Sequence, residues 1–200
     1  MLAAGTALTT AFGVAACQGR PAADFGGPSA TAPASAPAPV RVLDGKPTTA
    51  ATDAPTRMTI PALNLNAVVD AVGVDRRTGE LAVPPSVDRV GWYRFGPGFA
   101  ATAGSIVLAG HVDSAAQGEG AFFRLGSLEK GDEITLTGPG ERTRSFRVVA
   151  RERYRKTAIP LEKYFARDGA VRLTLITCGG PFDPNTRHYR DNVVVTAFLS

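Results

Sequence analysis

The sequence contains few of the residues that build disulfide frameworks and metal sites: two cysteines and two histidines among 200 residues. A structural zinc site usually takes four cysteine or histidine ligands, more than this chain comfortably supplies. The chain also lacks a glycine-rich phosphate loop, because Gly96-Pro97-Gly98 is short and interrupted by proline. We therefore expect no bound metal ion and no cofactor.

A strong charge of one sign is missing as well. The formal net charge is +4, and residues 1–56 hold three basic and three acidic side chains, which cancel. The excess of 19 basic over 15 acidic side chains falls on residues 57–200. This imbalance is too small to indicate a nucleic-acid partner.

The chain opens with an uncharged, mostly apolar stretch from Leu2 to Ala16. Its length suits the core of a signal peptide, or a minimal membrane span when it is extended to Gly19. The segment Val14-Ala15-Ala16-Cys17 also resembles a bacterial lipoprotein cleavage box, in which Cys17 would be acylated. A lipid anchor and an uncleaved helix both stay open. In either case residues 1–19 are predicted to be a signal peptide or membrane anchor, with the remainder outside the cytoplasmic membrane.

Residues 20–56 are predicted to be a disordered linker. Seven prolines and ten alanines occupy residues 21–56, with few large apolar groups. Such a segment cannot bury enough surface to fold, and its prolines keep it extended. We expect it to tether a folded domain, residues 57–200, away from the membrane.

The folded domain has the pattern of a mostly antiparallel β-barrel. About eight short strand-like runs are separated by turn residues, and no β-α-β alternation is present. Along residues 145–154 the apolar side chains alternate with Arg147, Arg151 and Arg153, which predicts a solvated arginine face. Two brief helices are predicted, over Ala121 to Leu128 and within Leu161 to Arg167.

The run from Val171 to Thr177 predicts a buried strand that ends at Cys178, followed by two glycines. Because Cys17 belongs to the export segment, Cys178 has no disulfide partner within the domain. An unpaired thiol in an exported protein suggests a reactive one. The alternative is an inert thiol buried at the end of the strand, since free cysteine is among the most buried residue types.

His111 and Arg190 are the candidate partners of this thiol. The apolar run from Ile106 ends on His111, so His111 and Cys178 are expected at the same rim of the barrel. A thiol beside an imidazole is the minimum equipment for acyl transfer through a thioester. Arg190, twelve residues after Cys178, could stabilise the oxyanion of a tetrahedral intermediate, with Arg187 as the rival cation.

These residues resemble the sortase family. Thr174-Leu175-Ile176-Thr177-Cys178 is similar to its Thr-Leu-x-Thr-Cys signature, and Ala109-Gly110-His111 resembles its histidine-bearing strand end. Arg190 stands at the position of the family's arginine. The runs Gly91-Trp92-Tyr93, Phe122-Phe123-Arg124-Leu125 and Tyr189-Arg190-Asp191-Asn192-Val193-Val194-Val195 are similar to actinobacterial class F sortases in particular. The resemblance runs from about Met58 to Leu199.

The resemblance implies an eight-stranded sortase-like β-barrel with one or two short helices, preceded by a disordered tether. It implies a cysteine transpeptidase or peptidase that is anchored at the extracytoplasmic face of the bacterial membrane and faces the cell wall. In the family the cysteine attacks the Thr–Gly bond of an LPXTG-like sorting signal of secreted proteins. The histidine protonates the leaving amine, and the arginine braces substrate and oxyanion. An acceptor amine or water then resolves the thioester.

The residues that the resemblance makes catalytic are therefore His111, Cys178 and Arg190. The continuation Cys-Gly-Gly-Pro-Phe-Asp differs from class A enzymes, which leaves the sorting motif and the acceptor amine open. Papain-like enzymes place the cysteine before the histidine, and L,D-transpeptidases place Ser-His-Gly before the cysteine, so both fit worse. The alternative function is a non-catalytic, anchored β-barrel that binds a cell-wall component through its arginine face.

Overall fold

A computed structural model describes residues 23–26, 51–77 and 79–200. The predicted anchor with Cys17 and most of the predicted linker lie outside these residues. Among the described residues no helix is long and apolar enough to cross a membrane.

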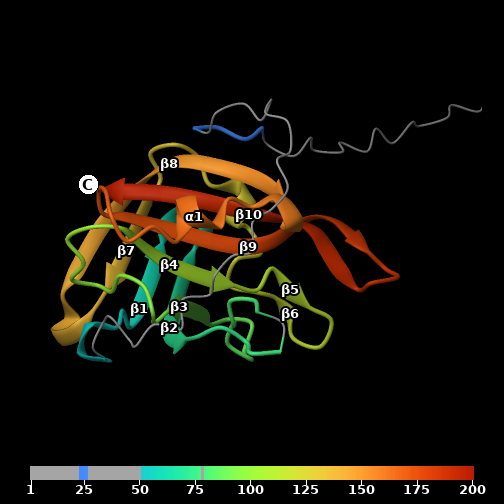
Figure 1. Cartoon of the computed structure of the whole chain (residues 1–200), viewed down its shortest axis with the longest axis horizontal. Helices are drawn as coiled ribbons and strands as arrows, with labels where there is room; N and C mark the ends of the chain where they lie inside the picture. The colour runs from blue at the N-terminus through green and yellow to red at the C-terminus, as the bar shows by residue number, and fades with distance from the viewer. Residues whose placement is uncertain (1–22, 27–50, 78) are drawn as a thin grey trace, which may run out of the picture.

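Eight strands form a closed barrel in the order β1-β2-β3-β4-β9-β10-β8-β7 (Figure 1). A separate two-stranded sheet pairs β5 with β6. This confirms the predicted mostly-β, eight-stranded barrel. The strands are β1 (Arg57–Ile60), β2 (Leu65–Val72), β3 (Val90–Tyr93), β4 (Ser105–Gly110), β5 (Asp113–Ser114), β6 (Gly118–Glu119), β7 (Glu133–Thr137), β8 (Thr143–Arg155), β9 (Arg172–Asp183) and β10 (His188–Leu199).

Two of the barrel's neighbouring strand pairs are parallel, β2 with β3 and β4 with β9, whereas the other pairs are antiparallel. The barrel interior is filled by aliphatic and aromatic side chains from all eight strands, including Trp92, Leu108, Phe146 and Leu173, each at most 1% exposed. β4 is buried along its whole length because it lies between β3 and β9 and packs against this core. The barrel is therefore a rigid support for residues at the ends of these strands.

The predicted helices are shorter than expected. Residues 121–128 contain only a 3₁₀ turn at Leu125–Ser127, and the second helix is the single turn α1 (Leu161–Tyr164). Phe122, Leu125 and Leu128 are buried with helical spacing, which explains the prediction. The backbone N–H of Phe122 donates to the carbonyl of His111 at 3.0 Å, and the hydrogen bonds within the segment span three residues, so it forms turns tied to the end of β4 rather than an α-helix.

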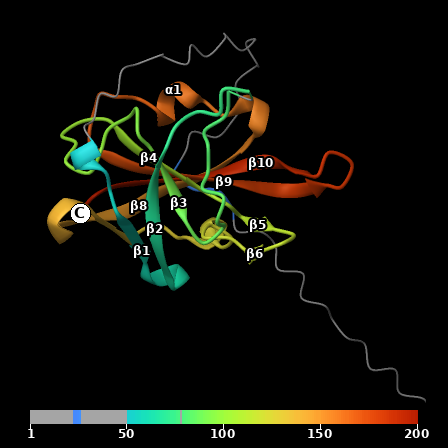
Figure 2. The same ribbon diagram turned by 90° about the horizontal axis from the view of Figure 1, so that it is seen from below.

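The last two strands form a longer hairpin than the sequence predicted. β9 continues past Cys178 to Asp183, and β10 begins at His188 rather than Asn192. Figures 1 and 2 both show the tip of this hairpin projecting from the barrel, at the same end as β5 and β6. Glycine and proline after Cys178 predicted a loop, yet the chain stays paired through a register shift between Tyr189 and Asp191.

The predicted arginine face of β8 is only partly solvated. Arg147 and Arg153 are exposed, but Arg151 is 3% exposed. Its guanidinium donates to the carbonyls of Leu128 and Ala23 and lies 4.8 Å from the centre of the Phe25 ring. The prediction was wrong for Arg151 because residues 23–26 cover it.

Residues 23–26 lie along the open edge of β8. Phe25 and Arg151 exchange two backbone hydrogen bonds of 2.9 Å, and the Asp24 carboxylate accepts one from the Arg153 N–H at 3.0 Å. β7 pairs with β8 only as far as Arg147, and the next residue, Val148, bonds to Gly131 and Asp132. Beyond Val148 no described barrel strand lies along this edge of β8, whose other edge is paired with β10. The short segment forms hydrogen bonds with part of this edge. An unpaired strand edge can pair with another chain. The extent of the predicted linker stays a prediction.

Candidate active site

The parallel pairing of β4 with β9 places the candidate histidine and cysteine at the same end of two neighbouring strands. Leu108 pairs with Leu175 and Ala109 with Ile176. Ala109 and Ile176 are the last pair of this ladder, and His111 and Cys178 each follow two residues later, so both leave the same end of the β4–β9 pair. Adjacent strands lie about 4.8 Å apart, so the backbone segments that follow their ends start close together. The expectation that both residues lie at one rim of the barrel therefore has a structural basis.

A buried hydrogen bond fixes this register immediately before the two candidates. The hydroxyl of Thr177 donates to the carbonyl of Gly110 at 2.8 Å, and Thr177 is 4% exposed. Each partner directly precedes a candidate residue, so the bond limits sliding of β4 past β9. Sequence reasoning treated Thr177 only as part of a motif. A threonine hydroxyl in an otherwise apolar strand is the signal that could have found it.

Cys178 is a half-buried free thiol on β9, opposite Asn192 of β10. The two glycines after it are required by close packing. A Cβ on Gly179 would lie 2.8 Å from Cγ2 of Val193, and one on Gly180 would lie 2.2 Å from Oδ2 of Asp191. Gly180 also has a φ of +73°, which favours glycine. The glycines thus allow the irregular pairing beside Cys178.

His111 is half-buried and follows β4 directly. Its Nε2 lies 2.9 Å from the carbonyl oxygen of Pro84. A carbonyl oxygen only accepts hydrogen bonds, so Nε2 carries a proton and donates it. Nδ1 is then the ring nitrogen whose lone pair can accept a proton. Sequence reasoning missed this orienting role of the Pro84 carbonyl.

Arg190 lies on β10 beside the register shift, and its side chain is 52% exposed. Its Nη2 is 3.5 Å from Oδ2 of Asp183 across the hairpin. The pKa of Asp183 is lowered mainly by the backbone N–H of Asn185, with smaller contributions from Thr186 and Arg190. The pair is exposed and long, so it holds the guanidinium only weakly.

The rival residues lie at the exposed tip of the hairpin. Arg187 has a φ of 56° in the turn, and its side chain is exposed. His188 is also exposed and pairs with Asp183 at the first position of β10. Neither has a hydrogen bond or ion pair to the segments around Cys178 and His111 among the described contacts.

Sequence reasoning also missed a link between the β9–β10 hairpin and the β5–β6 hairpin. The hydroxyl of Tyr189 donates to Oδ2 of Asp113 at 2.5 Å. This bond raises the pKa of Tyr189, as do partial burial, the charge of Asp113 and, to a smaller extent, the charge of Cys178. Tyr189 and Asp113 are 76 positions apart in the chain, so no local pattern relates them.

Chemically, the end of the β4–β9 pair offers a partly accessible thiol and an oriented imidazole, and the hairpin beyond it carries a cation. A thiol beside an imidazole supports nucleophilic attack with proton transfer. Within residues 23–26, 51–77 and 79–200 no three histidine, cysteine, aspartate or glutamate side chains gather in a metal-binding cluster.

Comparison with known proteins relates the folded part of the chain to one family. The family model described as Sortase domain matches residues 58–200. A search of curated proteins finds no match.

Several solved structures share the fold. Sortase C-1 from Actinomyces oris aligns with a TM-score of 0.54 and 22% identity, over 72% of this chain and 72% of its own. Listeria monocytogenes sortase A aligns with a TM-score of 0.53 and 20% identity, over 74% and 88% of the two chains. A lid mutant of sortase A from Corynebacterium diphtheriae gives a TM-score of 0.54 and 21% identity, over 72% and 68%. At these identities the likeness concerns the fold.

Proposed function

The chain belongs to the sortase family, and from this premise we propose that it cleaves an LPXTG-like sorting signal through a thioester and transfers the peptide to an amine or to water. His111, Cys178 and Arg190 are the proposed catalytic residues. We further propose that it works at the extracytoplasmic face of the membrane, anchored by its N-terminal segment, and that it is of the class F type. The family accounts for the transpeptidase fold and a function related to the cell wall.

The observation that carries the proposal is the parallel register of β4 and β9. Ala109 pairs with Ile176, and the Thr177 hydroxyl binds the Gly110 carbonyl just before the two candidates. The proposal is therefore supported by backbone pairing. Side chains that rearrange when substrate binds do not disturb this pairing. Free Cys178 is half-buried, so a peptide can reach its sulfur.

In the first step, the sulfur of Cys178 attacks the carbonyl carbon of the scissile peptide. A C–S bond forms, and the carbonyl electron pair moves to oxygen, where Arg190 stabilises the oxyanion. The oxyanion then collapses, the C–N bond breaks, and the proton lost by the thiol reaches the leaving amine through Nδ1 of His111. Since Arg190 now pairs loosely with Asp183, it must leave this exposed ion pair when substrate binds.

In the second step, the lone pair of an incoming amine or water attacks the thioester carbonyl. A new C–N or C–O bond forms, the C–S bond breaks, and the nucleophile's proton passes through His111 to the sulfur. The free thiol is regenerated, so no oxidant or cofactor is consumed.

Peptide-library profiling of the full chain, with mass spectrometry of the intact enzyme, tests this function. We expect one class of sorting-signal peptide to be cleaved after threonine and the acyl group to appear on Cys178. Rapid alkylation of Cys178 by iodoacetamide would support the same conclusion. An inert thiol with no cleaved peptide would favour the alternative, a binding module for a cell-wall component.

A further inference from the structure

The projecting tip of the β9–β10 hairpin, residues 179–190, is called the arm. β4 pairs with β9 only as far as Ile176, and β8 pairs with β10 only from Asp191 onward. Beyond these points the arm has only its own two strands, and both views show it extending from the barrel (Figures 1 and 2). A two-stranded ribbon of this kind has little stability of its own.

Among the described hydrogen bonds and ion pairs, a single one joins the arm to an element other than β9 and β10. It is the bond from the Tyr189 hydroxyl to Oδ2 of Asp113, at 2.5 Å. The other polar contacts of arm side chains stay inside the arm, from Arg190 and from the Asn185 N–H to Asp183. The Tyr189 ring also packs edge-on against Phe182, with centroids 5.2 Å apart. We call the Tyr189–Asp113 hydrogen bond the clasp.

Asp113 is firmly connected to His111. It begins β5, two residues after His111, and pairs with Glu119 of β6. The returning chain is bound back to the same segment, because Gly120 N–H donates to the Val112 carbonyl and Phe122 N–H to the His111 carbonyl. The clasp therefore links the arm to the segment that carries the proposed acid and base.

Tyr189 directly precedes Arg190, so holding one also holds the backbone of the other. The Arg190 side chain is 52% exposed and its ion pair is 3.5 Å long, which leaves little else to fix the guanidinium. The nearby register shift allows the two strands of the arm to pivot relative to the barrel.

We propose that Asp113 and Tyr189 are positioning residues whose hydrogen bond holds the arm against the His111 segment and so sets where Arg190 lies relative to Cys178. Its catalytic consequence rests on the proposed function, whereas the mechanical link does not. The bond is charge-assisted, with a phenol as donor and a carboxylate as acceptor, which makes it stronger than a neutral hydrogen bond.

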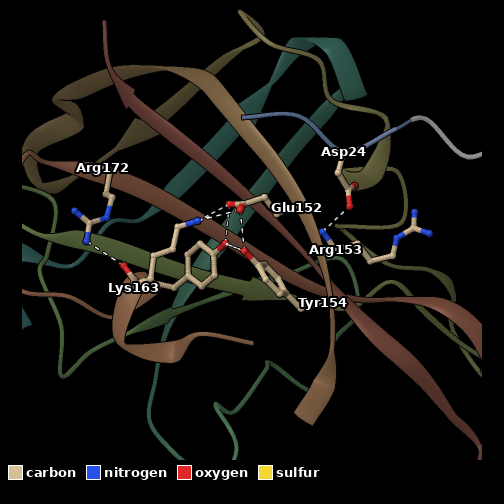
Figure 3. Close-up of polar contacts among 7 residues, drawn as sticks. Asp24, Glu152, Arg153, Tyr154, Lys163 and Arg172 are labelled. Atoms are coloured by element: carbon tan, nitrogen blue, oxygen red, sulfur yellow. Dashed lines mark hydrogen bonds and ion pairs between the residues drawn. The ribbon is translucent and has the colours of Figure 1, made fainter. Parts of the chain in front are cut away.

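The first test is Tyr189→Phe, which removes the hydroxyl and keeps the ring on Phe182. We expect kcat to fall by about 10- to 100-fold, since a displacement of about 1 Å at a catalytic group can have that effect. KM for the peptide should change much less. Tyr154→Phe is the matched control, because Tyr154 also donates to a carboxylate, that of Glu152, at 2.8 Å on β8 (Figure 3). Its kcat should stay within about twofold of the wild type.

Substitutions of the acceptor, Asp113, distinguish the effect of the hydrogen bond from the effect of the carboxylate charge. Asp113→Ala should match Tyr189→Phe, because the hydroxyl loses its acceptor. Asp113→Asn keeps an oxygen that can accept the bond and should restore much of kcat. Equal losses in the alanine and asparagine variants would mean that the carboxylate charge matters rather than the clasp, and would overturn the proposal.

Coupling to Arg190 gives the sharpest readout. Arg190→Lys alone should cost about 100- to 1000-fold, as for a lost oxyanion donor, whereas Arg187→Lys should be nearly neutral. If the clasp acts through Arg190, the double variant Tyr189→Phe/Arg190→Lys should be hardly worse than Arg190→Lys. Multiplying losses would show that the two residues act independently and would overturn the proposal.

Hydrogen exchange tests the clasp without any substrate. In Tyr189→Phe, amide exchange in residues 179–190 should accelerate about 5- to 10-fold, the effect of losing one hydrogen bond. Exchange in β1 and β7 should be unchanged, and Tyr154→Phe should leave the arm as it is. If the wild type cleaves no peptide, the proposed function fails while this measurement still decides the clasp; unchanged exchange in the arm would refute it.

Discussion

His111 has one ring nitrogen available for proton transfer, because its Nε2–H is bound to the carbonyl of Pro84 at 2.9 Å. This arrangement fixes both the tautomer and the orientation of the ring. Gly120 packs against the same residue, since a Cβ there would lie 2.3 Å from the His111 carbonyl oxygen. The ring of His111 is thus held through Nε2 and its backbone is packed against Gly120, while His188 at the tip of the arm is exposed.

The two histidines should therefore differ in their effect on turnover. His111→Ala should lower kcat by about 100- to 10,000-fold, the range for a general acid or base, since an unassisted amine leaves poorly. His188→Ala should change kcat by no more than a few-fold. Both are measured on one cleavable peptide, with folding checked by circular dichroism. Equal losses would show that the acid is assigned to the wrong residue.

Glu152 of β8 forms a buried polar cluster with residues of α1, and the proposed catalytic residues take no part in it. Its carboxylate accepts hydrogen bonds from the Lys163 ammonium and from the hydroxyls of Tyr154 and Tyr164, each at about 2.8 to 3.0 Å (Figure 3). Burial opposes ionisation of Glu152, but these three donors outweigh it, and the pKa of Glu152 is lowered. The cluster ties α1 to the barrel.

Glu152→Gln should destabilise the protein in a pH-dependent way. At neutral pH we expect a loss of about 1.5–3 kcal/mol in the free energy of unfolding, as for hydrogen bonds to a charged group. Because the carboxyl has a lower pKa in the folded than in the unfolded state, its stabilisation is complete above the ordinary value of 4.5 and is lost as the pH falls through the folded pKa. Urea unfolding of both proteins between pH 3 and 8 measures the difference, and a gap that widens in acid would contradict it.

At the scale of the elements, β8 is longer than the strands that flank it, and residues 23–26 occupy part of its free edge. The contact joins Phe25 to the Arg151 guanidinium, which is otherwise a buried cation with two carbonyl partners. Phe25 also packs against the barrel core. Composition alone marks this stretch as linker, because one phenylalanine among alanines, prolines and glycines carries no periodic signal.

Phe25→Ala should lower stability without changing catalysis. Losing a desolvated cation–aromatic contact and part of a buried ring should cost about 1–2 kcal/mol, which lowers Tm by about 2–8 °C for a domain of this size. Phe123→Ala is the control, because that ring is 43% exposed. Thermal unfolding of the full chain distinguishes them, and equal shifts in the two variants would mean that residues 23–26 add nothing to stability.

At the same scale, apolar runs between turn residues predicted most barrel strands. Alternation marked the strand over residues 145–154, because a strand with one face in the core shows it directly in sequence. The arm was predicted as a loop, since the pairing of residues 179–183 depends on a glycine with positive φ and on partners in β10. The prediction of a solvated arginine face was wrong at Arg151 for a similar reason. Contacts made by a distant segment leave no trace in the local pattern.

For the whole molecule, the candidate site could be predicted by residue type but not by geometry. Cys178 and His111 stand out because cysteine and histidine are few and these two follow apolar runs. Arg190 was predicted from its distance to Cys178 and from the resemblance. The parallel pairing of β4 with β9, which joins residues 67 positions apart in the Thr177–Gly110 bond, follows only from the closed barrel. The same holds for the Tyr189–Asp113 bond. The roles of the three candidate residues stay predictions.

The barrel also divides β9 into a part that stabilises and a part that reacts. Leu173 is fully buried and pairs with Ile106 of β4, while Cys178 lies five residues further along, about 17 Å at the usual strand rise. Leu173→Ala removes core packing far from the thiol, and should lower the free energy of unfolding by about 2–5 kcal/mol. Cys178→Ala removes a half-buried sulfur outside the core cluster and should leave that energy nearly unchanged.

Activity should follow the opposite order, because turnover per folded molecule depends on the nucleophile and not on the reserve of stability. Leu173→Ala should keep kcat within about threefold at a temperature where it is folded, whereas Cys178→Ala should have no turnover and no acyl-enzyme by mass spectrometry. Denaturant unfolding and peptide cleavage on the same preparations give both quantities. Residual turnover by Cys178→Ala would require another nucleophile, and a collapse of kcat in folded Leu173→Ala would show that the two halves of β9 are not separable. Because the barrel is a rigid support with the proposed chemistry at one end, we expect the two halves of β9 to be separable.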